Sequence, residues 1–98
     1  MKREVALAKL RPLEQRLRQQ GVTALYLFGS TARGDENNAS DVDLIFEYDP
    51  ASTFDMVNQS GVYLELRDAL GVEVDLVSRY AMRPSFRAHV EPEMYRVF

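Results

Sequence analysis

The stretch from Gly29 to Leu44, GSTARGDENNASDVDL, decides the expected fold of this chain of 98 residues. It begins with a Gly-Ser pair directly after the apolar run 24–28, and it ends with two aspartates, Asp41 and Asp43, separated by one residue. Glycine permits a tight turn that brings backbone N–H groups close to an anion, and paired carboxylates are ligands for divalent cations. The stretch therefore combines the requirements of a phosphate site with those of a metal site.

The two aspartates are expected on one face of a β-strand. The segment 40–48 alternates, and its apolar face carries Val42, Leu44, Phe46 and Tyr48. Asp41 and Asp43 fall on the other face with Cα atoms about 6.5–7 Å apart, so both can hold the same ions. Aspartate is depleted in strands, so two of them here require a reason. Taken alone, the pair also fits an edge strand with a solvated acidic face.

A second β-rich segment, 71–77, repeats this alternation with Asp75 in its middle. Val72, Val74 and Leu76 face one way, and Asp75 faces the other way. If this strand lies beside the first, Asp75 completes a cluster of three carboxylates. Three like charges would repel one another, whereas two divalent ions about 3.5–4 Å apart would make the cluster a clamp for attacking and leaving oxygens.

The glycine turn offers further groups that suit a phosphate. Ser30 has a small hydroxyl that can donate to a phosphate oxygen. The segment 31–33 is expected to begin a short helix, whose free N–H groups would favour an anion. Arg33 either pairs with a phosphate oxygen or makes a surface ion pair with Asp35 or Glu36.

The combined motif resembles the minimal nucleotidyltransferases (MNT), a branch of the DNA polymerase β-like superfamily. The resemblance rests on the Gly-Ser pair, ten intervening residues, the Asp-x-Asp pair and the later strand aspartate, and it covers residues 24–75. It implies an α/β (α+β) fold in which helices pack on a small mixed sheet. It also implies nucleotidyl transfer from ATP with two Mg²⁺ ions.

Residue by residue, the resemblance implies these roles. Gly29 and Ser30 bind the triphosphate, and Arg33 matches the motif as a further ATP-binding residue. Asp41 and Asp43 hold both Mg²⁺ ions. Asp75 holds the ion that activates the acceptor hydroxyl.

The resemblance also implies a partner. Many MNT proteins are antitoxins paired with small all-helical HEPN ribonucleases, and some transfer AMP from ATP onto a tyrosine of that toxin. We therefore expect a protein adenylyltransferase in a hetero-oligomer with a HEPN-type toxin. The alternatives are a non-catalytic antitoxin that acts by occlusion, and the catalytic subunit of a two-chain small-molecule nucleotidyltransferase.

The composition indicates one globular domain over residues 1–98 and excludes several classes of function. A net charge of −3 gives no general attraction to nucleic acid, which argues against a template-dependent polymerase or a tRNA-modifying enzyme. Without cysteine there is no disulfide or thiolate metal site, and the single His89 fits a surface or capping role. The sequence shows no signal peptide or membrane-length apolar run, so the cytoplasm is the expected compartment.

The flanking segments are expected to be mainly helical. An amphipathic helix over 2–20 would kink at Pro12 or start near Arg11, and a second helix is expected over 54–70 with Gly71 as its cap. A loop over 79–84 and a short helix over 85–90 follow, and 94–98 is expected to form a final strand or an extended tail. Three apolar residues near the end either pack onto the sheet or, if exposed, contact a partner: Tyr95, Val97 and Phe98.

Overall fold

Helices and strands alternate along the chain in the computed structural model, which describes residues 1–34 and 42–98. The first half contains α1 (Arg3–Leu10), the 3-10 turn η1 (Arg11–Leu13), α2 (Glu14–Gln19), β1 (Val22–Phe28), α3 (Gly29–Arg33) and β2 (Val42–Tyr48). The second half contains α4 (Met56–Leu70), β3 (Val74–Ser78), η2 (Arg79–Ala81), α5 (Pro84–Val90), η3 (Glu91–Glu93) and β4 (Tyr95–Arg96).

The four strands form one mixed sheet in the order β3-β2-β1-β4. Strand β1 runs antiparallel to both β2 and β4, whereas β2 and β3 are parallel. Parallel neighbours need a crossover connection, and α4 supplies it between β2 and β3. The predicted fold class, a small mixed sheet with helices packed on it, is confirmed.

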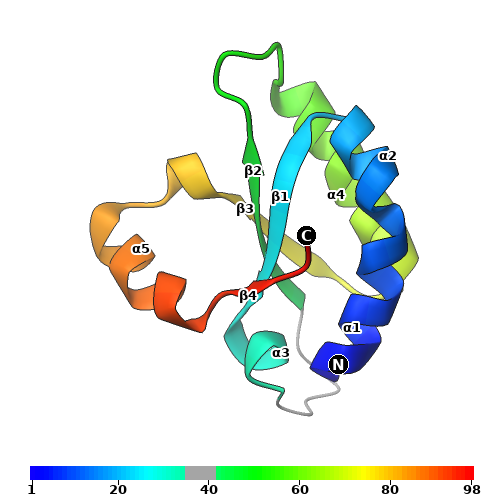
Figure 1. Cartoon of the computed structure of the whole chain (residues 1–98), viewed down its shortest axis with the longest axis vertical. Coiled ribbons are helices and arrows are strands. Elements are labelled where there is room, and N and C mark those ends of the chain that lie inside the picture. Colours follow the sequence, from blue (N-terminus) through cyan, green and yellow to red (C-terminus); the bar gives the residue numbers. More distant parts are fainter. Residues whose placement is uncertain (35–41) are drawn as a thin grey trace.

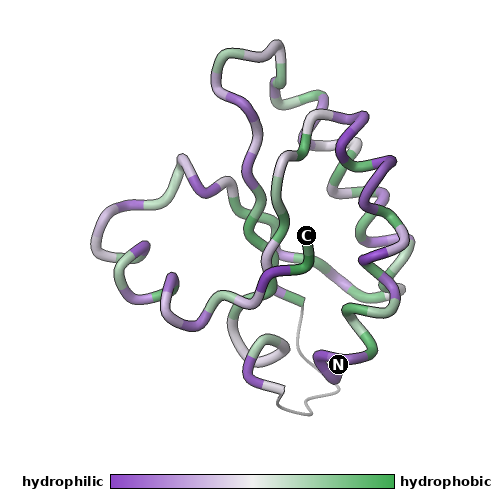
Figure 2. Tube along the Cα trace, in the orientation of Figure 1, coloured by the Kyte–Doolittle hydropathy of each residue, from purple (hydrophilic) through white to green (hydrophobic). Residues whose placement is uncertain are grey.

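The alternation along β2 separates two faces of the sheet. Val42, Leu44 and Phe46 are fully buried in the main hydrophobic core, on the face that α1, α2 and α4 cover (Figure 1). Figure 2 shows hydrophobic positions concentrated in the central strands and hydrophilic positions along α1 and α2. Ile45 lies on the opposite face, in a smaller cluster with Met82 and Val90. The predicted alternation of β2 is therefore confirmed over its described residues.

The N-terminal helix is interrupted at Pro12. Helix α1 ends at Leu10, η1 contains Pro12, and α2 begins at Glu14. Proline lacks a backbone N–H and its ring clashes with the carbonyl four residues earlier, which explains the break. The side chains that these two helices bury lie on one apolar stripe: Ala6, Leu7, Leu10 and Leu17.

Helix α4 is capped at both ends. The Asp55 carboxylate accepts a hydrogen bond from the Asn58 N–H at 3.0 Å, and the Asn58 side chain accepts one from the Asp55 N–H at 3.0 Å. This reciprocal capping box starts the helix at Met56, two residues later than predicted. Gly71, at φ +70°, closes the other end by donating to the Arg67 carbonyl at 2.8 Å, as predicted.

The C-terminal segment completes the sheet. The Val97 N–H donates to the Leu25 carbonyl at 2.8 Å, and the Leu25 N–H donates to the Phe98 carbonyl at 3.1 Å. Val97 and Phe98 are buried in the main core, while Tyr95 is 38% exposed. Exposure of Val97 and Phe98 for a partner is therefore ruled out, because both side chains pack onto the sheet.

The helices are short relative to a lipid bilayer. A helix needs about 20 apolar residues to span the hydrocarbon core, and α4 has 15 residues. Within residues 1–34 and 42–98, no helix has the length and apolar character to cross a membrane.

Two glycines of α4 allow a matched test of backbone conformation. A Cβ at Gly61, in the middle of the helix, or at Gly71 would meet no atom within 4 Å. We expect Gly61→Ala to raise the free energy of unfolding by about 0.5–1 kcal/mol, because alanine loses less backbone entropy in a helix. Gly71→Ala should lower it by about 1–2 kcal/mol, because Gly71 has a positive φ and Gly61 does not. Urea unfolding measures both, and effects of the same sign would contradict this assignment.

Candidate functional site

The candidate site begins with a row of three residues that crosses the sheet. Phe28 at the end of β1 is in register with Asp43 on β2, and Asp43 is in register with Asp75 on β3. Neighbouring strands lie about 4.8 Å apart, so the pairing brings the two carboxylates side by side. Asp43 is half-buried and Asp75 is exposed. The condition under which the sequence places Asp75 beside Asp43, that their strands are neighbours, is therefore met.

The third predicted carboxylate, Asp41, lies outside the described residues, so its place in the cluster stays a prediction. Within residues 1–34 and 42–98, no group of three His, Cys, Asp or Glu side chains is arranged to hold a metal ion. In this part of the chain the site therefore contains the pair Asp43 and Asp75.

The glycine turn lies directly against Asp43 of this pair. Gly29 has φ +71°, and a Cβ built on it would overlap the Oδ2 atom of Asp43. A side chain at position 29 would therefore be strained by the backbone conformation and would displace the neighbouring carboxylate. The sequence predicted glycine for close approach to phosphate, and the structure adds that the turn also makes room for Asp43.

The turn leads directly into helix α3. Phe28, the residue before this helix, has no polar side chain that could cap the N–H groups of its first turn. Ser30, in that first turn, is half-buried, whereas Thr31 is fully buried. The short helix predicted from residue 31 therefore begins two residues earlier, at Gly29, and its N-terminus lies beside Asp43.

Long-range contacts hold α3 in position. Arg3 of α1 donates to the Ala32 carbonyl at 2.9 Å. Arg33 forms an ion pair with Glu93 of η3 at 3.6 Å, and both side chains are about half-exposed. The sequence predicted either a phosphate or Asp35 and Glu36 as the partner of Arg33, and the last two lie outside the described residues. The contact with Glu93 could not be read from local spacing.

A second polar cluster lies on the same face of the sheet. Tyr26 donates to Glu47 at 2.8 Å, and Arg79 donates to Glu47 at 3.0 Å and to Glu91 at 3.1 Å. Burial and the bond to Glu47 raise the pKa of Tyr26, and the hydrogen bond to Glu91 raises the pKa of Arg79. Tyr26 therefore stays a neutral donor and Arg79 a cation at neutral pH. No local sequence pattern indicates this cluster, which attaches η2 and η3 to the strands.

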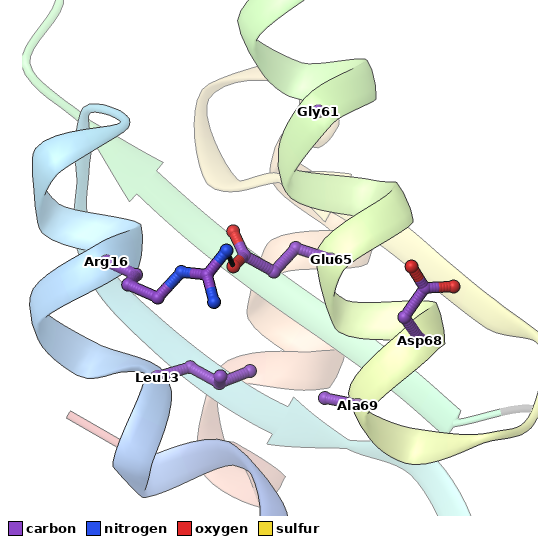
Figure 3. Close-up of a pocket in the computed structure, with 6 residues that line it drawn as sticks. All are labelled: Leu13, Arg16, Gly61, Glu65, Asp68 and Ala69. Carbon is purple, nitrogen blue, oxygen red and sulfur yellow. Dashed lines mark ion pairs between the residues drawn. The ribbon is translucent and has the colours of Figure 1, made fainter.

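A separate hollow of about 520 Å³ lies between the N-terminal helices and α4, and Figure 3 shows its lining residues: Leu13, Arg16, Gly61, Glu65, Asp68 and Ala69. Arg16 forms an ion pair with Glu65 at 2.6 Å, and Gln20 also donates to Glu65. This hollow is on the helical side of the molecule, whereas Asp43 and Asp75 face the other side of the sheet. It is therefore separate from the site.

His89, in the last turn of α5, is exposed, as a surface role requires.

Comparison with known proteins places this geometry in a family. The family described as nucleotidyltransferase domain matches residues 10–96. The chain belongs to the nucleotidyltransferase domain family. The enzyme class that the motif implied is therefore confirmed.

Individual relatives of this nucleotidyltransferase agree with the assignment. A protein of Methanocaldococcus jannaschii, named as a candidate protein adenylyltransferase, is 31% identical over 75 residues, which cover 76% of this chain and 77% of that protein. A solved structure described as a candidate minimal nucleotidyltransferase superposes with a TM-score of 0.81 and 30% identity, and the match covers 96% of this chain and 94% of the other.

The fold of this nucleotidyltransferase is also found in a toxin–antitoxin complex. A chain from the complex of an AMPylated Shewanella oneidensis HEPN toxin with its MNT antitoxin superposes with a TM-score of 0.67 and 21% identity. The match covers 95% of this chain and 71% of that chain. The predicted resemblance to the minimal nucleotidyltransferases is confirmed.

Proposed function

We propose that this nucleotidyltransferase transfers AMP from ATP to a hydroxyl, most simply a tyrosine hydroxyl, of a HEPN-type ribonuclease toxin and thereby acts as its antitoxin. The observation that carries the proposal is the contact between Gly29 and the Asp43 carboxylate, in a row with Asp75. The glycine turn that we propose for the triphosphate thus lies beside two carboxylates. The names of the relatives, protein adenylyltransferases and MNT antitoxins, support the choice of a protein acceptor.

The residues fit the Mg²⁺ that the family implies. Asp43 and Asp75 offer oxygen ligands, which Mg²⁺ prefers, and the room that Gly29 leaves lets the Asp43 carboxylate reach the turn. Asp41, which the sequence motif pairs with Asp43, would add a third carboxylate. When bound, Mg²⁺ would neutralise phosphate charge that develops as pyrophosphate leaves.

The remaining steps follow from this chain's own groups. The backbone at Gly29 and the Ser30 hydroxyl would hold the triphosphate, so that the α-phosphorus faces the carboxylates. Asp75 would orient the acceptor hydroxyl and take up its proton. The hydroxyl oxygen then bonds to the α-phosphorus as the bond to pyrophosphate breaks. Catalysis would consist mainly of positioning and electrostatic stabilisation.

A titration of the partner separates an enzyme from a binder. If neutralisation is catalytic, a small amount of this protein with Mg-ATP should inactivate an excess of the HEPN-type ribonuclease. The partner should gain mass in units of AMP on a hydroxyl-bearing residue. Intact-mass spectrometry after co-incubation measures this gain, and a ribonuclease assay on the same samples measures neutralisation.

The double variant Asp41→Asn with Asp43→Asn tests whether neutralisation depends on the carboxylates. It should lose both the mass gain and the substoichiometric neutralisation. Neutralisation by occlusion would instead need at least stoichiometric protein, would need no ATP, and would survive the double substitution, because a tight interface depends on buried anchors. A silenced partner of unchanged mass would therefore exclude the enzymatic proposal.

A further inference from the structure

The exposed edge of the sheet lies directly beside the candidate site. In the described residues, β3 pairs with β2 alone and forms one end of the strand order. Two adjoining hollows of about 300 and 340 Å³ run along this edge, and Met56 and Gln59 of α4 line both. The first hollow also reaches Val74, Asp75 and Leu76. We call the two hollows together the edge groove.

The backbone of β3 presents hydrogen-bonding groups to this groove. The Val42 N–H donates to the Glu73 carbonyl at 3.1 Å, so the backbone groups of Glu73 point toward β2. Backbone groups of alternate residues in a strand point to opposite edges, so those of Leu76 and Ser78 point outward. Both residues line the edge groove. An extended peptide can add to such an edge through main-chain hydrogen bonds.

The side chains of the groove indicate what such a peptide would carry. Met56, at the first position of α4, is 73% exposed. Methionine is flexible and readily packs against irregular apolar surfaces, so this side chain is available for contact with a peptide. Val74 and Leu76 point toward α4, because their side chains belong to or pack against the main core. The groove therefore offers apolar contacts on the α4 side of the edge.

The charges of the groove are of one sign. Asp75 lines the first hollow and Asp55 lines the second, and no Lys or Arg is among the described residues that line either one. A complementary peptide would therefore carry basic residues near its ends.

We propose that an extended segment of the acceptor protein, outside its helices, adds to β3 as a fifth strand, with the acceptor residue beside Asp75. This inference rests on the proposed function and specifies where its substrate docks. Residues paired across neighbouring strands face the same side. The acceptor hydroxyl would thus continue the row formed by Asp43 and Asp75, while the residues directly before and after it would enter the edge groove on the α4 side.

A pair of synthetic peptides tests this alternation. The first, Lys-Val-Thr-Val-Tyr-Val-Thr-Val-Lys, places valine at one and three residues on either side of the tyrosine, and its symmetry suits either strand direction. The second, Lys-Thr-Val-Thr-Tyr-Thr-Val-Thr-Lys, exchanges every valine with threonine and so sends the apolar side chains to the wrong face. Amide NMR of this protein with each peptide measures affinity and location. We expect the first peptide to bind more tightly and to shift the amides of Leu76 and Ser78 more than that of Val77.

Two neighbouring exposed residues supply matched variants. Met56→Glu replaces an apolar contact to the valines with a carboxylate that the bound peptide would desolvate. This cost should outweigh the attraction of the carboxylate to the terminal lysines, so affinity for the first peptide should fall about tenfold. Val57→Glu makes the same kind of change one residue along, at a side chain that is 78% exposed and does not line the groove. It should change affinity less than about twofold. Both carboxylates would lie in the first turn of α4, where negative charge is favourable, so the fold should tolerate each one.

The outcomes separate this proposal from the proposed function. Absence of peptide binding at millimolar concentration, equal binding of the two peptides, or shifts away from β3 would overturn the docking site. So would AMP transfer to the HEPN-type protein that is unaffected by Met56→Glu. Binding of the first peptide at β3, together with weaker binding in Met56→Glu, would support the docking site even if neither peptide nor protein gains AMP. Absence of AMP transfer would reject the proposed function alone.

Discussion

Asp43→Asn should reduce nucleotidyl transfer by about three orders of magnitude while it leaves the fold intact. The substitution removes the charged oxygen that contacts the glycine turn and stands next to Asp75. Catalysis at such a site depends on groups that are prearranged around developing charge, and the loss of one such group typically costs about 10²–10³-fold in rate. AMP incorporation from labelled ATP measures the rate. The metal-free variant should be no less stable than the wild type, because it has lost a like-charge repulsion.

Asp68→Asn is the matched control for this substitution. Asp68 is exposed on α4 and lines the hollow on the helical side of the molecule, away from the carboxylate pair. The Asp68→Asn variant should retain both activity and the rise in melting temperature that Mg-ATP gives the wild type, whereas Asp43→Asn should lose that rise. Equal stabilisation of the wild type and Asp43→Asn by Mg-ATP would show that the site is placed wrongly.

Gly29→Val should abolish measurable binding of the triphosphate. The side chain would enter the space that Oδ2 of Asp43 occupies, and valine strongly disfavours the positive φ of this turn. Titration calorimetry with Mg-ATP measures the loss. Ser30→Ala should be milder and cost at most roughly 1.5–3 kcal/mol, the value of one hydrogen bond to a charged group.

Gly34→Ala isolates the role of the Asp43 contact. Gly34 also has a positive φ, +80°, but a Cβ there would meet no atom within 4 Å. The two substitutions Gly29→Ala and Gly34→Ala thus share the backbone strain, and only the first displaces the carboxylate. ATP affinity should fall much more in Gly29→Ala. An unchanged affinity in Gly29→Val would remove the turn from the mechanism.

The local features of this fold could be predicted because they depend on short periods in the sequence. Apolar residues at alternate positions of β2 identified the core face, and Asp43 followed as a residue of the other face. Pro12 marked the break between α1 and α2, and Gly71 marked the end of α4. Each of these features is decided by steric or hydrophobic effects within a few residues.

Features that depend on distant segments could not be predicted in the same way. The parallel register of Asp43 with Asp75 depends on the crossover through α4. The sequence indicates only that the two aspartates would meet if their strands were neighbours. The ion pair of Arg33 with Glu93 and the cluster around Arg79 join residues far apart in the chain, without a shared period. The overlap between a side chain at position 29 and the Asp43 carboxylate likewise arises from tertiary packing.

The division of β2 between two faces has a consequence for inheritance. Its core residues, such as Leu44, determine whether the chain folds, whereas Asp43 between them contributes to chemistry and leaves the packed volume of the core unchanged. A duplicated gene could therefore lose the Asp43 carboxylate and still encode a folded protein. A single substitution at Asp43 can thus remove the proposed chemistry without rebuilding the scaffold.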